Sequence, residues 1–145
     1  MLSSLPEQIW AVAMLAVSTY AWWRGGWVER AVAATNVVAW IATIIVQNRT
    51  NWVDPQWGMF AVDVIFLGVL LGLVVRSDRT WILPAAAFQL LGVVTHAAII
   101  ADEGVRARAY MTALILWSYL VLITLAVGAH LYARRRVIVP GSEGV

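Results

Sequence analysis

The sequence predicts an all-α integral membrane protein, a bundle of five transmembrane helices with short links. Hydrophobic residues make up 62% of the 145 residues and charged residues 12%, whereas soluble domains average about 45–50% and about 25%. Five apolar stretches each approach the ~20 residues that cross a hydrocarbon core ~30 Å thick. The stretches lack the strict alternation of polar and apolar residues that is typical of a membrane β-barrel.

The five stretches cover residues 5–23, 28–47, 58–75, 81–101 and 109–133. In lipid the backbone must satisfy its own hydrogen bonds, so each stretch is predicted to be a helix. Together they form a single transmembrane helical domain over residues 1–133. Residues 134–145 are predicted to be a flexible, Arg-rich cytoplasmic tail. A four-helix bundle with the first helix at its periphery is the alternative.

The links and their charges predict the topology. Because the links are short, consecutive helices are expected to be antiparallel neighbours. The first link contains Gly25 and Gly26, which break a helix and tolerate positive φ. Basic residues are enriched on the cytoplasmic side of membrane proteins, so the N-terminus is expected outside and the C-terminus in the cytoplasm of a bacterial cell, with the chain in the inner membrane. The side that holds the C-terminus carries seven of the ten basic residues: Arg24, Arg30, Arg76, Arg79, Arg134, Arg135 and Arg136.

Several kinds of site are not predicted. The chain has no Cys, which excludes disulfides, thiolate metal sites and cysteine nucleophiles. No nucleotide-binding loop or hydrolase motif is present. His96 and His130 are expected near opposite ends of the bundle and so cannot clamp one haem. We therefore expect no metal, no cofactor and no catalytic constellation. The expected partners are the lipid bilayer and a membrane protein or second copy, and not nucleic acid.

Nine Trp residues favour an aromatic belt at each membrane boundary, where an amphipathic ring prefers the headgroup level. Trp40 and Trp117 are predicted to lie deeper, in the packing or in a pocket wall. The belt is predicted to contain Trp10, Trp22, Trp23, Trp27, Trp52, Trp57 and Trp81.

Asp63 and His96 are the candidate site at membrane depth. Each lies about five residues from the outer end of its helix, so the two are expected at similar depth on neighbouring helices. Gln89 shares a helical face with His96, and Asn36 lies on a polar face of the second helix. Intramembrane ionisable groups usually face the bundle interior or water. The four residues therefore form a predicted pocket for a ligand, an ion or a proton, and a purely structural interhelical hydrogen bond is the alternative.

Gly68 and Gly72 form a small-xxx-small pair, which predicts close approach by a neighbouring helix. Since this pair lies on a different face from Asp63, the third helix is expected at the centre of the bundle.

A series of short segments resembles a family of small, uncharacterised bacterial multi-pass integral membrane proteins. The resemblance covers most of the chain and implies a multi-pass membrane protein, but no activity, cofactor or site residue. The segments that carry it are 23–26, 29–30, 76–81, 86–90, 92, 95–96, 102, 109–110 and 117–120.

Three functions are consistent with these patterns. The leading hypothesis is a non-enzymatic accessory or partner-binding bundle, because no catalytic constellation and no soluble domain are present. The second is a small transporter, channel or sensor that uses the predicted outward-facing pocket. The third is an intramembrane enzyme acting on lipid, with His96 as base and Asp63 orienting it, but a nucleophile and a second acid are lacking.

Overall fold

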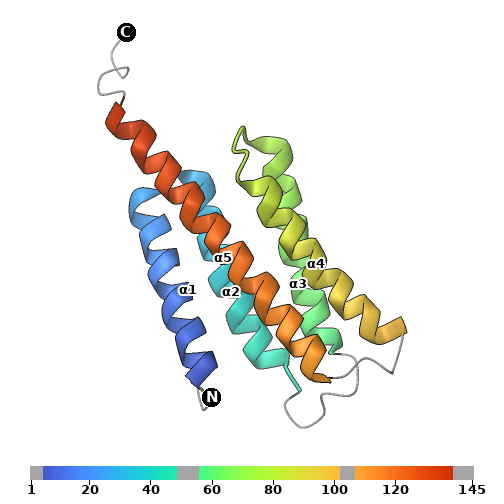
Figure 1. Cartoon of the computed structure of the whole chain (residues 1–145). Helices are drawn as coiled ribbons and strands as arrows, with labels where there is room; N and C mark the ends of the chain where they lie inside the picture. The colour runs from blue at the N-terminus through green and yellow to red at the C-terminus, as the bar shows by residue number, and fades with distance from the viewer. Residues whose placement is uncertain (1–4, 49–55, 102–106, 139–145) are drawn as a thin grey trace.

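The computed structural model describes residues 5–48, 56–101 and 107–138. The described chain folds into five α-helices (Figure 1), which confirms the predicted all-α class. Their bounds agree with the predicted stretches to within a few residues, except at the end of the last helix. The helices are α1 Leu5–Arg24, α2 Trp27–Val46, α3 Trp57–Arg76, α4 Ile82–Ala101 and α5 Ala107–Ile138.

The last helix, α5, extends five residues beyond its predicted end at Ala133. The predicted tail boundary at residue 134 is therefore wrong. Arg is a good helix former, and positive charge in the last turns interacts favourably with the helix dipole. With 32 residues, α5 is about 48 Å long at 1.5 Å per residue, and it projects beyond the other helices in Figure 1. Residues 139–145 of the predicted tail lie outside the described residues.

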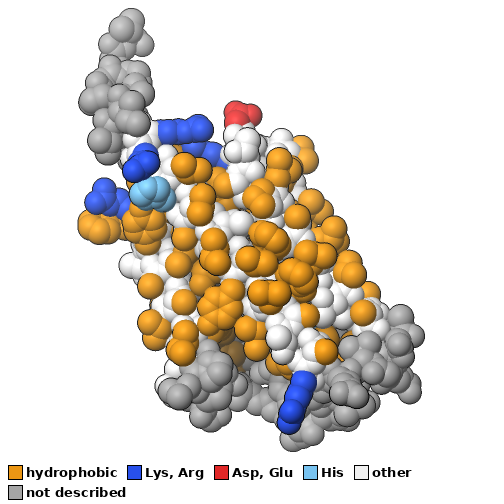
Figure 2. All heavy atoms as spheres, in the orientation of Figure 1, with side chains coloured by type: hydrophobic (Ala, Val, Ile, Leu, Met, Phe, Trp, Pro, Cys, Tyr) orange, Lys and Arg blue, Asp and Glu red, His pale blue; other side chains and the backbone are white. Residues whose placement is uncertain are grey.

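Four helices are long and apolar enough to cross a membrane. They are α2, α3, α4 as far as Ile99, and α5 between Arg108 and Arg135. The remaining helix, α1, has the same length as α2 but is not among the four, and its first turns carry polar residues. Hydrophobic side chains dominate the middle of the molecular surface, and most of the visible charged side chains gather at one end (Figure 2).

The helices pack in a closed ring in which each contacts the next and α5 returns to contact α1. In addition α5 contacts α2 across the ring, so α2 and α5 each touch three helices and the other helices two (Figure 1). Within the described chain, α3 contacts only α2 and α4. A Cβ added at Gly68 or Gly72 would meet nothing within 4 Å, so the prediction that these glycines admit a neighbouring helix of the same chain is wrong.

Small residues let the helices of the core approach closely. Ala21, Ala85 and Ala129 are fully buried at helix crossings, and Gly128 of α5 lies directly against the ring of Trp81. Lipid offers no hydrophobic driving force between helices, so tight van der Waals packing of this kind holds a membrane bundle together.

A buried carboxylate joins three elements at the end of the bundle where α1 turns into α2. Glu29 has no exposed surface and accepts hydrogen bonds from the Gly26 backbone N–H (2.8 Å) and from Trp81 Nε1 (3.0 Å). Arg79 Nε lies 4.0 Å from Glu29 Oε1. We call these four residues the Glu29 cluster. Its indole is buried, so the prediction that Trp81 belongs to the aromatic belt is wrong.

The same cluster explains the two glycines between α1 and α2. Gly26 has a φ of −83°, so the predicted need for positive φ does not apply there. A Cβ at Gly26 would lie 2.9 Å from the ring of Tyr132, and one at Gly25 would collide with the Ala21 carbonyl. The glycines are required by space, because α5 and the buried Glu29 approach this turn closely.

The packing of Gly128 against Trp81 predicts a large effect for a small substitution. In Gly128→Ala the added methyl group collides with the indole, which should lower the free energy of unfolding by about 1–3 kcal/mol. In Gly68→Ala the methyl group enters open space, and the better helix propensity of Ala should leave stability equal or higher by up to about 1 kcal/mol. Unfolding by SDS in mixed micelles measures both variants, and equal effects would contradict the packing described.

Candidate functional site

A cavity of about 450 Å³ lies inside the ring, and all five helices contribute to its lining. It occupies the half of the bundle that contains the beginning of α1 and the end of α2, since its lining residues on α2 run from Asn36 to Gln47. Most of its wall is apolar or aromatic. This composition, with a small number of polar groups, is typical of small-molecule sites.

Asp63 of α3 presents its carboxylate to this cavity and is held from α4. Gln89 Nε2 donates to Asp63 Oδ1 (3.0 Å) and also contacts the Asp63 backbone oxygen (3.2 Å). His96 Nε2 lies 3.0 Å from Oδ2. The structure therefore brings Asp63 and His96 together at the same height on neighbouring helices, as the sequence predicted. The carboxyl side chain is still 27% exposed, so it remains accessible from the cavity.

His96 links this carboxylate to α5. The imidazole is 1% exposed, and its Nδ1 lies 2.7 Å from the hydroxyl of Tyr110. A neutral ring with its proton on Nε2 fits this geometry if Tyr110 donates, and an imidazolium fits if Tyr110 accepts. In either state a continuous hydrogen-bonded chain runs from α5 through α4 to the carboxylate of α3, and a proton can pass along such a chain. We call Asp63, Gln89, His96 and Tyr110 the Asp63 cluster.

Asn36 of α2 also lines the cavity, but no hydrogen bond joins it to the Asp63 cluster in the described part of the chain. Its side chain is more than nine-tenths buried, and within the described part of the chain its Nδ2 has no hydrogen-bond partner. An unpaired buried amide costs about 1–3 kcal/mol.

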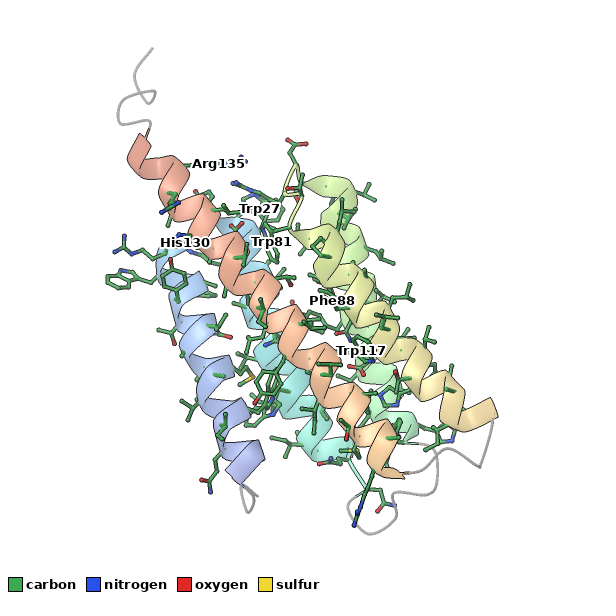
Figure 3. All side chains as sticks on the ribbon, in the orientation of Figure 1. Trp27, Trp81, Phe88, Trp117, His130 and Arg135 are labelled. Atoms are coloured by element: carbon green, nitrogen blue, oxygen red, sulfur yellow. The ribbon has the colours of Figure 1, made fainter. Side chains whose placement is uncertain are left out.

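Aromatic side chains form much of the wall. Trp10 of α1 packs edge-on against Tyr119 of α5, with ring centroids 4.9 Å apart, and Trp117 donates through Nε1 to Thr95 Oγ1 (3.1 Å). Trp40 also lines the cavity. The prediction that Trp40 and Trp117 form a pocket wall is confirmed (Figure 3 labels Trp117 on α5).

Trp10 is half-buried and lines the cavity, and its predicted place in the belt stays a prediction. The other described members of the predicted belt are exposed, and Trp52 lies outside the described residues. The exposed members are Trp22, Trp23, Trp27 and Trp57. His130 is exposed near the other end of the bundle, where its Nδ1 lies 3.4 Å from the Tyr20 hydroxyl, and it takes no part in the site (Figure 3).

Sequence reasoning missed two residues of these clusters, Tyr110 and Glu29. Tyr110 lies three residues after the start of α5, near the same end of the bundle as His96. This shared height is the signal that could have identified it. Glu29 lies three residues after Gly26, the N-cap of α2. From this position a carboxylate reaches back to the backbone N–H of the N-cap residue. Within the described chain, no three His, Asp or Glu side chains lie close enough together to hold a metal ion.

Comparison with known proteins adds no identification. No protein-family model matches the chain, and neither the curated proteins nor the solved structures contain a significant match. The predicted resemblance to a bacterial membrane-protein family therefore stays a prediction.

The contact between Tyr110 and His96 predicts a loss of stability when the hydroxyl is removed. Tyr110→Phe leaves the buried Nδ1 without its partner, which should lower the free energy of unfolding by about 1–3 kcal/mol. Tyr119→Phe is the matched control, because the Tyr119 hydroxyl makes no hydrogen bond within the described part of the chain. Stability of both variants in the same detergent, measured by SDS titration, is the test, and equal stability would contradict the hydrogen bond.

Proposed function

We propose that the chain is a five-span protein of the bacterial inner membrane, with its N-terminus outside and its C-terminus in the cytoplasm. Four helices have the length and hydropathy to span. The fifth, α1, supports the proposal because it has 20 residues and packs against both α2 and α5. Arg24, Arg30, Arg79 and Arg135 lie toward one end of the bundle, and the positive-inside rule assigns that end to the cytoplasm. The cavity then lies in the outer half of the membrane.

A cysteine label tests this orientation, because the native chain contains no Cys. Ser142→Cys should react with a membrane-impermeant maleimide only after the cells are broken. A cysteine at Ser3 should react in intact cells, and it serves as the matched control at the other terminus. Labelling of residue 142 in intact cells would contradict the proposed orientation.

We further propose that the protein handles a small molecule in its cavity, as a sensor, carrier or transporter. The observation that carries this proposal is the Asp63 carboxylate, which is fixed by His96 and Gln89 yet still faces a cavity of about 450 Å³. Charged groups at membrane depth are costly and usually functional. If Asp63 only fixed the packing of α3 on α4, its polar partners would be sufficient and exposure to a cavity would not be needed.

A partner-binding bundle is the second candidate function. The specific observation in its favour is the open face of α3, where Gly68 and Gly72 have space around them and Ile65 and Leu71 are exposed. Small residues on a spanning helix permit close approach of another helix, from a partner protein or from a second copy.

Native mass spectrometry of the protein, extracted mildly from its own membrane, distinguishes the two functions. The pocket proposal predicts a retained small molecule of fixed mass that is lost in Asp63→Asn and kept in Asp78→Asn, which makes the same chemical change in an exposed link. A co-released protein or a fixed homo-oligomer with no small molecule would overturn the pocket proposal and favour the partner-binding bundle.

A further inference from the structure

We infer that the cavity selects an organic cation, namely a small amphiphilic ammonium compound with an apolar or aromatic body. The inference rests on the proposed function, since it requires that the cavity binds a small molecule at all. It goes beyond that function by assigning the charge and the chemical class of the ligand.

The charge follows from the side chains that line the cavity. Asp63 is the only charged side chain on the described wall, and no Arg or Lys contributes to it. His96 approaches the carboxylate from the side of α4 and is almost fully buried. At low dielectric the attraction or repulsion between charges is much stronger than in water. With His96 neutral and its proton on Nε2, one of the two states that fit the geometry, the wall carries a net negative charge. A cation is then attracted to the accessible part of the carboxylate, whereas an anion is repelled and meets no Arg or Lys on the described wall.

The aromatic wall favours an organic cation over a metal ion. Trp10, Trp40, Trp117 and Tyr119 all line the cavity that Asp63 faces. Aromatic faces attract ammonium groups, and sites built from several rings are typical of quaternary ammonium recognition. Hard metal cations such as Ca²⁺ instead take 6–8 oxygen ligands, which this mostly apolar wall does not supply.

The volume and the remaining side chains of the wall fit the same class. A cavity of about 450 Å³ lies within the ~300–1,000 Å³ range of sites for drug-sized ligands. Apolar side chains such as Ile44, Phe66 and Leu114 complete the wall and can cover a hydrocarbon or aryl body. A molecule with one charged and one apolar part matches this distribution.

The test uses three probes of similar size on the full-length protein in nanodiscs. Benzyltrimethylammonium is the cation, neopentylbenzene is its neutral isostere with carbon in place of nitrogen, and phenylacetate is an aromatic anion. Equilibrium dialysis, with protein-free nanodiscs subtracted, measures the three dissociation constants. We expect the cation to bind at least tenfold more tightly than the isostere, and the anion not to bind.

Variants then assign the selectivity to residues. Asp63→Asn should reduce the preference for the cation over the isostere at least fivefold, whereas Asp78→Asn, on the exposed link, should keep it. Trp40→Leu should also weaken cation binding, and it tests the cavity if Asp63→Asn fails to fold.

The outcomes separate this inference from the proposed function. Binding of the isostere or the anion as tight as that of the cation would overturn the cation inference and leave the small-molecule pocket standing. Failure of all three probes to bind, together with no retained molecule in native mass spectrometry, would overturn both.

Discussion

The hydrogen bond between His96 and Asp63, 3.0 Å long, is the interaction on which the Asp63 cluster and its place at the cavity depend. It joins α3 to α4 inside an apolar bundle, where a carboxylate without partners would be costly. Tyr110 supports the imidazole from α5 and Gln89 holds the second carboxylate oxygen. Three helices thus fix one acidic group at the edge of a cavity, and its side chain remains partly exposed there.

Another carboxylate, Glu29, is fully buried at the other end of the bundle, and its role is structural. It has no exposed surface, and the groups around it are a backbone N–H, an indole and a guanidinium. It does not line the cavity beside Asp63, and it fixes the α1–α2 turn against the link before α4. The contrast shows why burial alone does not mark a functional group. Asp63 combines polar partners with access to a cavity, whereas Glu29 has partners alone.

The all-α class, the five helices and the shared depth of Asp63 and His96 could be predicted, because hydropathy and helix rise fix lengths and heights. Which helix faces which could not be predicted. The Gly68–Gly72 pair indicated a central α3, but those glycines face outward, and within the described chain α3 contacts two helices whereas α2 and α5 each contact three. Trp81 has the sequence position of a belt residue yet is buried, because the direction in which a side chain points depends on packing partners that a single sequence does not reveal. The contact of Tyr110 with His96 could not be predicted for the same reason.

Nitrogen NMR of the imidazole tests the central claim most directly. The sequence contains two His residues, so a His130→Gln protein labelled with ¹⁵N-histidine reports on His96 alone. The two hydrogen bonds of His96 predict that Tyr110→Phe shifts the Nδ1 resonance most and that Asp63→Asn shifts the Nε2 resonance most, because each variant removes the partner of one ring nitrogen. Resonances of His96 that are unchanged in both variants would contradict the hydrogen-bonded chain and, with it, the fixed carboxylate at the cavity wall.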